Sequence, residues 1–150
     1  MAAAAQIRAS LQVKLNNQWY QSQPPGFSAD VPGLAGPTPG TIAVAVNVTV
    51  VSLTQITSVG GVAGLAYIRN LDQVNIVQMG AYSAGLAAFF PIMDFLPGEG
   101  YVIRLSGFLG KEEIPGTGTG LIVGTTQLAF KALNAPCQVQ VDIFGATPPP

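Results

Sequence analysis

The sequence contains no histidine and a single cysteine, and each shortage excludes a class of function. Histidine is the commonest general base and the commonest metal ligand, so its absence removes Ser-His-Asp and Cys-His catalysis. One cysteine, Cys137, permits neither an internal disulfide framework nor a cysteine-based zinc site. Cys137 opens an alternating run with Val139, Val141 and Ile143, which predicts a small core residue and not a nucleophile. We therefore expect no enzyme activity, no cofactor and no bound metal.

Charge is also scarce: only 9% of residues are charged, and the net charge is -1. About 25% is usual in soluble domains, so the exposed surface must be unusually neutral. Without a basic field that could hold phosphates or anionic lipids, neither nucleic acid nor a membrane is an expected partner. Since 49% of the residues are hydrophobic, the exterior is poorly soluble unless other subunits cover it. The composition predicts a component of an assembly, and we expect a homo-oligomer.

Long uninterrupted apolar runs are missing as well. Met1–Ser10 lacks the apolar stretch that a secretory signal requires. The uncharged region between Asp30 and Arg69 is broken by prolines and glycines, and its apolar centre, Thr41–Leu53, is shorter than the roughly 20 residues of a membrane span. Neither export nor membrane insertion is expected.

Strand-like patterns and turns make up most of what is present. Ile7–Leu15 alternates apolar and polar residues, and Thr41–Leu53 is rich in valine and isoleucine. Further strands are predicted at Gly64–Arg69, Gln73–Met79, Leu86–Met93, Tyr101–Phe108, Gln127–Leu133 and Gln138–Phe144. Asn70–Asp72 and Pro97–Gly100 have turn chemistry and are expected to be hairpin connections. Because no capped helical period appears, we predict an all-β fold: an antiparallel, jelly-roll-like β-sandwich of about eight strands.

The chain is expected to form one structural domain with an extended N-terminal arm. Residues 1–40 are the first strand and the arm, residues 41–146 the sandwich, and residues 147–150 a disordered tail. Trp19, Tyr20 and Phe27 lie in the proline- and glycine-rich part of the arm. Aromatic side chains are costly to leave in water, so they are the predicted interface residues. They are expected to pack either on the chain's own sandwich or on a neighbouring subunit.

Two acidic pairs could in principle serve glycoside hydrolysis, namely Glu112 with Glu113 and Asp94 with Glu99. Adjacent residues on a strand point to opposite faces, so Glu112 and Glu113 are better explained as a solvated loop tip. The glycine-rich segment Gly116–Gly120 matches neither dinucleotide nor Walker spacing and is expected to be a hinge or bulge. We assign no catalytic or metal-binding residue.

A carbohydrate-binding β-sandwich is an alternative function, because aromatic rings can stack on sugars. The candidate residues are Trp19, Tyr20, Tyr67, Tyr82 and Tyr101.

A resemblance rests on the order of short motifs between Gly64 and Phe144. Asn-Leu-Asp-Gln-Val-Asn at residues 70–75 precedes a strand, Pro-Gly-Glu at 97–99 introduces Val-Ile-Arg-Leu, and Val-Gln-Val-Asp-Ile at 139–143 comes near the end. This layout resembles small structural proteins of tailed-bacteriophage virions. The resemblance implies a virion component made in the host cytoplasm, with the major capsid protein or other virion proteins as partners. Within that class a capsid decoration or cement protein is expected, and a neck or tail component is the alternative.

Overall fold

The computed structural model describes residues 3–7, 11–15, 18–22, 27–31, 38–53, 62–105 and 126–146, and these residues form strands and their connections without a helix. Four strands belong to the N-terminal arm: β1 (Ala3–Ile7), β2 (Leu11–Leu15), β3 (Gln18–Ser22) and β4 (Phe27–Val31). Eight strands form the body: β5 (Thr38–Val44), β6 (Thr49–Val50), β7 (Val62–Asn70), β8 (Val77–Ser83), β9 (Ala88–Phe95), β10 (Gly100–Arg104), β11 (Thr126–Ala132) and β12 (Cys137–Ala146). In this described part, nothing forms a helix long and apolar enough to span a membrane.

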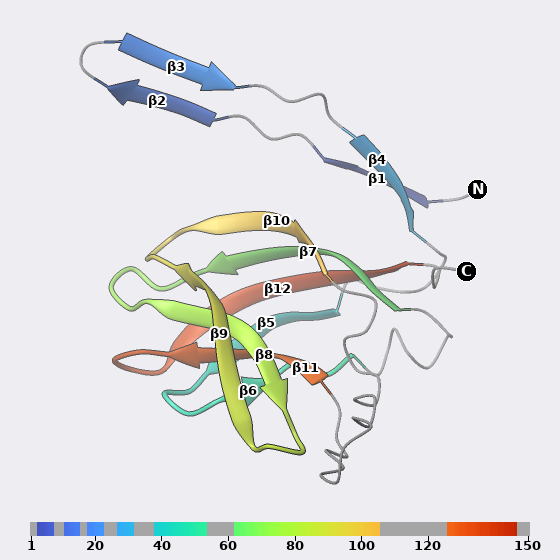
Figure 1. Ribbon diagram of the computed structural model, residues 1–150, viewed down its shortest axis with the longest axis vertical. Coiled ribbons are helices and arrows are strands. Elements are labelled where there is room, and N and C mark those ends of the chain that lie inside the picture. Colours follow the sequence, from blue (N-terminus) through green and yellow to red (C-terminus); the bar gives the residue numbers. More distant parts are fainter. Residues whose placement is uncertain are drawn as a thin grey trace, which may run out of the picture.

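The body consists of two four-stranded sheets, with the strand orders β10-β7-β12-β5 and β6-β11-β8-β9 (Figure 1). Every neighbouring pair is antiparallel. Apolar side chains at alternate positions of the strands fill the space between the sheets. On β12 the buried residues are Val139, Val141 and Ile143, and the residues between them are more exposed. Phe130 of β11 and Phe95 of β9 belong to the same buried cluster. The expected all-β, sandwich-like architecture is thus confirmed at the level of two antiparallel sheets of four strands.

The two turns predicted as hairpin connections instead cross between the sheets. Strand β7 pairs with β10 and β12, whereas β8 pairs with β9 and β11. Strand β9 likewise pairs with β8, whereas β10 pairs with β7. The hairpin prediction was wrong because turn chemistry specifies a reversal of the chain and does not specify which strand becomes the partner.

Two long strands expected from the sequence are each divided. The predicted strand Ile7–Leu15 overlaps β1 and β2, and Thr41–Leu53 overlaps β5 and β6. Between β5 and β6 the chain bends, and the hydroxyl of Thr49 accepts a hydrogen bond from the backbone N–H of Ala45 (3.1 Å). The hinge or bulge expected at Gly116–Gly120 and the tail at 147–150 lie outside the described residues.

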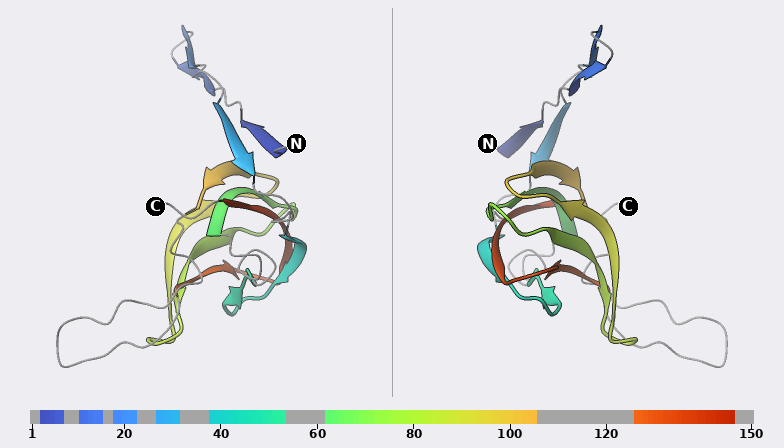
Figure 2. Two further views of the ribbon diagram at one scale, coloured as in Figure 1. Left: turned by 90° about the vertical axis from the view of Figure 1, so that its right-hand side faces the viewer. Right: turned by 90° about the vertical axis from the view of Figure 1, so that its left-hand side faces the viewer.

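The arm forms two short antiparallel ladders, β1 with β4 and β2 with β3. The β2–β3 ladder stands away from the two sheets in Figure 1 and in the side views of Figure 2. At the base of the arm, β4 contacts β12. The arm therefore has more regular structure than its prolines and glycines predicted.

Candidate interaction site

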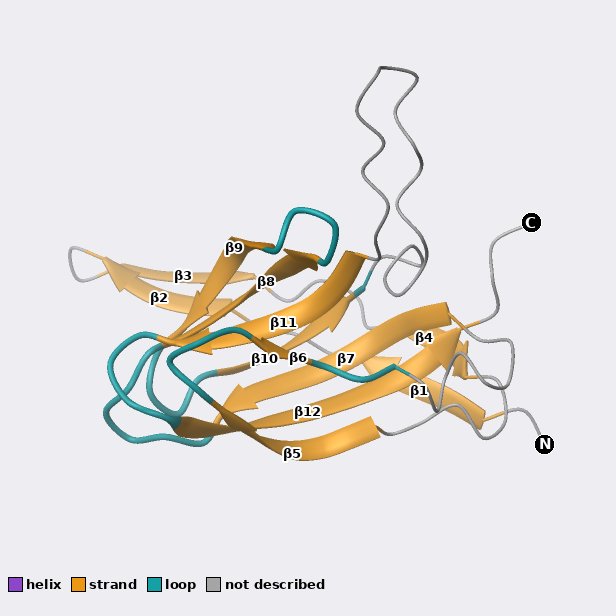
Figure 3. Cartoon of the chain, turned by 90° about the horizontal axis from the view of Figure 1, so that it is seen from below, coloured by secondary structure: helices purple, strands orange, loops and turns teal. Residues whose placement is uncertain are grey.

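Four loops of the body gather at one end of the two sheets, and we call them the loop end. They are residues 45–48, 71–76, 96–99 and 133–136, and Figure 3 shows them together on the left. Backbone hydrogen bonds join neighbouring loops: the N–H of Gly98 donates to the carbonyl of Asp72 (3.0 Å), and the N–H of Leu133 donates to the carbonyl of Ile76 (3.1 Å). Three of the loops are therefore parts of one hydrogen-bonded unit, and the fourth, residues 45–48, is bonded to the end of β11, where the carbonyl of Ala45 accepts from the N–H of Ala132 (2.9 Å).

The side chain of Asn70, at the end of β7, forms hydrogen bonds to two of these loops. Its side chain is completely buried, and its amide nitrogen lies within hydrogen-bond distance of three backbone carbonyls, of Asn75 (2.7 Å), Phe95 (3.2 Å) and Leu96 (3.2 Å). Its amide oxygen accepts a hydrogen bond from the N–H of Asp72 (3.0 Å). A buried amide is tolerated only when it is bonded in this way, so Asn70 fixes the loops relative to the core.

Asp72 and Glu99 are the only charged residues of the four loops, and both bind backbone N–H groups there. One carboxylate oxygen of Asp72 accepts hydrogen bonds from the N–H groups of Asn75 and Val74, both at 2.7 Å. The hydrogen bond from the N–H of Asn75 has the largest effect and that from Val74 the next, and both lower the pKa of Asp72 below its ordinary value. Glu99 accepts a hydrogen bond from the N–H of Leu96 (2.9 Å). Both carboxylates thus stabilise the loop backbone.

Large apolar side chains from all four loops are exposed at the loop end. They are Val46 (40% exposed), Leu71 (36%), Val74 (78%), Leu96 (49%) and Leu133 (42%). A hydrogen-bonded backbone that presents exposed apolar side chains has the properties of a preorganised protein-binding surface. The loop end is therefore the candidate interaction site of the body.

The three aromatic residues expected at an interface lie in the arm but do not share one ladder face. Trp19 and Tyr20 are neighbours on β3, so they belong to opposite faces of the β2–β3 ladder. Phe27 is paired with Ile7 in the other ladder. Their role as interface residues stays a prediction.

The tyrosines considered for sugar stacking are not brought to one place. Tyr67 is on β7 of one sheet and Tyr82 on β8 of the other. Tyr101 of β10 packs edge-on against Phe95, with ring centroids 5.5 Å apart. Three rings on separate strands of two sheets do not form a common stacking platform.

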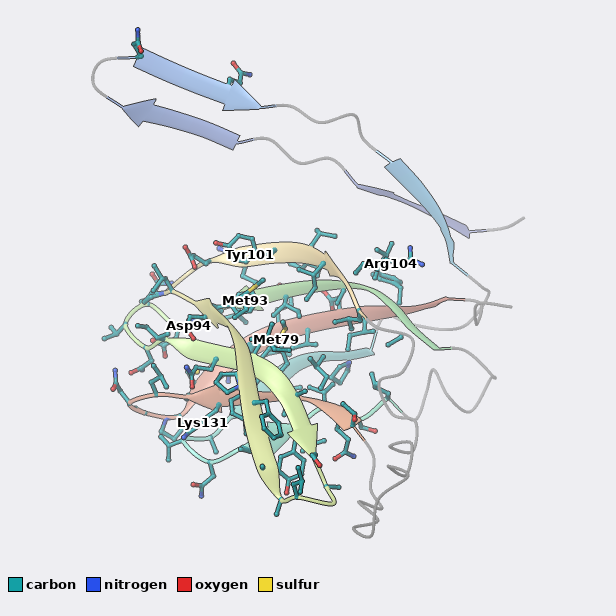
Figure 4. All side chains as sticks on the ribbon, in the orientation of Figure 1. Met79, Met93, Asp94, Tyr101, Arg104 and Lys131 are labelled. Carbon is teal, nitrogen blue, oxygen red and sulfur yellow. The ribbon has the colours of Figure 1, made fainter. Side chains whose placement is uncertain are left out.

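The acidic residues considered for catalysis are engaged elsewhere or lie beyond the described part. Asp94 accepts a hydrogen bond from the amide of Gln78 (3.1 Å). In Figure 4, Asp94, Arg104 and Lys131 lie on three different strands. Within the described residues no three or more His, Cys, Asp or Glu side chains could together hold a metal ion. Glu112 and Glu113 fall outside that part, as does Gly116–Gly120.

Cys137 lies in the core cluster, where the sequence pattern placed it. Burial raises the pKa of its thiol, and the negative charge of Asp72 adds to this effect. A thiol that is buried and hard to ionise is a poor nucleophile.

The loop end was missed in the sequence although a signal for it exists. In all four of its loops an exposed leucine or valine stands next to a turn-forming asparagine, aspartate or proline: Val46 before Asn47, Leu71 before Asp72, Leu96 before Pro97, and Leu133 before Asn134. Apolar residues inside a turn have no local reason to be there, so they indicate contact with something outside the chain.

Comparison of the chain with family models, with curated proteins and with solved structures gave no match. The functional argument is therefore built on the residues and the geometry of this chain.

Proposed function

We propose that this chain is a non-enzymatic structural protein of a phage virion, most specifically a capsid decoration or cement protein that stabilises the head through contacts between subunits. The observation that carries this proposal is the arm, whose outer β2–β3 ladder stands away from the body (Figures 1 and 2). A lone two-stranded ladder is marginally stable at best in water. An arm of this kind is expected to be held by a neighbouring subunit, such as the major capsid protein, another virion protein or a second copy.

The strand pairing supports a jelly-roll-like sandwich as the finer architecture. When the eight body strands are counted from β5 to β12, the first pairs with the eighth, the second with the seventh, the third with the sixth and the fourth with the fifth. These nested pairs are what results when one long antiparallel ribbon rolls up into two sheets. Double-sheet jelly rolls occur in viral capsid proteins and in lectins, so the architecture agrees with the proposal without deciding between these two classes.

The surface favours protein contacts over sugar binding. Tyr67, Tyr82 and Tyr101 lie on separate strands of two sheets, whereas the exposed apolar side chains of the loop end come together from four loops. The low charge of the chain favours a permanently covered surface as well. A neck or tail component would use the same kinds of contact, and it is separated from a head protein by its position on the particle.

Co-sedimentation with purified source particles tests the proposal. The full chain should pellet with mature heads in fixed stoichiometry and should be missing from isolated tails. It should also pass through a glycan column without retention. Binding to tails alone identifies the neck or tail alternative, and retention on the glycan column without particle binding overturns the proposal.

Arm deletion tests which part makes the contact. Because β5 begins at Thr38 and Thr38 pairs with Ile143, the deletion should cover residues 2–37 and stop three residues before the end of the arm expected from the sequence. This variant should keep a β-type circular dichroism spectrum and lose particle binding. A companion variant replaces Trp19, Tyr20 and Phe27 with alanine in the full-length chain. If both variants fold and still bind particles, the arm is not the contact; if both unfold, the arm belongs to the chain's own core.

A further inference from the structure

The β2–β3 ladder, Leu11–Ser22, has one apolar face according to its register. Val13 is paired with Tyr20 and Lys14 with Trp19. Since alternate residues share a face, the three apolar residues of β2, Leu11, Val13 and Leu15, fall on one face with Tyr20, and the uncharged polar residues Gln18 and Ser22 complete that face. Lys14 is the only charged residue of both strands, and it falls on the opposite face. The outer end of the arm is thus an amphipathic ribbon.

The loop end matches this ribbon in character. It presents apolar side chains, and its two carboxylates are hydrogen-bonded to its own backbone. Covering the loop end with a weakly charged partner would therefore remove little water from charged groups on either side of the contact. The apolar face of the β2–β3 ladder carries no charged residue.

The β2–β3 ladder of one chain stands apart from the two sheets, on the side of the body where the loop end lies (Figures 1 and 3). The arm joins the body where β4 contacts β12, beside the start of β5, whereas the loop end is where β5 and β7 finish (Figures 1 and 3). An arm from one copy on the loop end of another joins two unlike surfaces; the contact closes as a two-fold dimer when two copies exchange arms, and it gives rings or open chains when each copy binds a different neighbour.

We infer that the loop end is the docking site for the β2–β3 ladder of a second copy of this chain. The contact places the apolar ladder face of Leu11, Val13, Leu15 and Tyr20 on the exposed side chains of the loop end. It gives the ladder the additional layer that two strands need for stability, and it covers the apolar loop residues. The inference rests on the proposed assembly function and assigns the surface through which copies join.

The edge strand β9 is a less favourable docking site for the β2–β3 ladder than the loop end. Pro91 lies in this edge strand and has no N–H to donate, and the pairing of β8 with β9 shifts register between Met79 and Gly80. A proline and a bulge are features that block the addition of a further strand. The ladder is therefore expected to dock through side chains on the loop end.

The test uses analytical ultracentrifugation of the full chain and two defective variants. The loop-end variant carries Val74→Lys and Leu96→Lys. Its matched control carries Ile92→Lys and Leu86→Lys, which introduce the same charges at similar exposure outside the loop end (72% and 52% exposed, against 78% and 49%). The tip variant replaces residues 11–22 with a short Gly-Ser linker. Circular dichroism checks that each variant keeps the β spectrum of the parent.

The parent and the control should self-associate into a dimer or a larger species. The loop-end variant and the tip variant should each lower the association constant by about a hundredfold or more, since truncating central interface residues commonly has effects of that size. Mixed together, the two defective variants should form a 1:1 heterodimer and nothing larger, because one intact ladder then meets one intact loop end. This complementation is specific to a contact between two unlike surfaces.

Every other outcome overturns the inference. A monomeric parent shows that copies do not join, and self-association of the tip variant shows that loop ends meet each other or that another surface is used. Equal loss in the control shows that the site is not the loop end, and no heterodimer in the mixture shows that the two surfaces are not partners. A monomeric parent that still binds particles through its arm contradicts this inference and leaves the proposed function standing.

Discussion

Replacing Asn70 with alanine should destabilise the body strongly, although the side chain is small and polar. The substitution leaves the carbonyls of Asn75, Phe95 and Leu96 and the N–H of Asp72 without their partner. Only the bond to Phe95 is fully buried, and the other three are partly reached by water. A buried group left unbonded costs about 1–3 kcal/mol, and partly exposed groups cost less. We therefore expect a loss of about 2–4 kcal/mol in the free energy of unfolding.

Urea denaturation followed by circular dichroism measures this loss. Fluorescence is unsuitable because the only tryptophan, Trp19, lies in the arm and does not report on the body. The matched control is Gln73→Ala, an exposed side chain in the same loop, which should change stability by less than about 0.5 kcal/mol. If Asn70→Ala were as mild as this control, Asn70 would not hold the loops together, and the rigidity of the loop end would need another source.

Two further predictions concern a carboxylate and a glycine. Hydrogen bonds from the backbone of Asn75 and Val74 lower the pKa of Asp72 below 3.8, so its contribution to stability is complete above that pH and is lost as the pH falls through the folded-state pKa. The urea midpoint of the parent should therefore exceed that of Asp72→Asn at pH 7, and the difference should shrink below about pH 4; a difference that grows on acidification would contradict the sign. A Cβ on Gly80 would overlap the carbonyl oxygen of Phe90 on the neighbouring strand, so Gly80→Ala should cost about 1–3 kcal/mol in thermal or urea unfolding, and an unchanged melting temperature would refute this close approach.

Strands with clean alternation and a buried face were predictable from the sequence. Gln138–Phe144 was predicted and β12 runs from Cys137 to Ala146, while Gln127–Leu133 was predicted and β11 runs from Thr126 to Ala132. Gln73–Met79 was displaced, because β8 begins only at Val77. The error came from Val74, an apolar residue of the loop end that is 78% exposed but looks like a core residue in a pattern.

The same confusion concealed the candidate site. Apolar residues at 46 and 74 were assigned to strands because hydrophobicity alone cannot separate a residue that faces the core from one that faces a partner. The loops meet only because β5, β7, β9 and β11 all finish at one end, which depends on pairing between strands far apart in the sequence. Local patterns carry no information on that pairing.

The nested strand pairing also determines the order in which the chain can fold. The innermost pair, β8 with β9, closes through a turn of four residues, 84–87, in which the hydroxyl of Ser83 accepts a hydrogen bond from the N–H of Leu86 (3.2 Å). The outermost pair brings Thr38 to Ile143, more than a hundred residues later in the sequence.

Local hairpins form in microseconds, whereas long-range pairs must first overcome the entropy of closing a large loop. Strand β5 and the arm attached to it therefore leave the ribosome long before their partner strand β12 exists. During synthesis β5 has no partner strand until β12 has been made, so its apolar residues stay exposed and can aggregate or bind chaperones. The proposed contact between the arm of one copy and the loop end of another needs a complete body, so the pairing of β12 is expected to precede assembly.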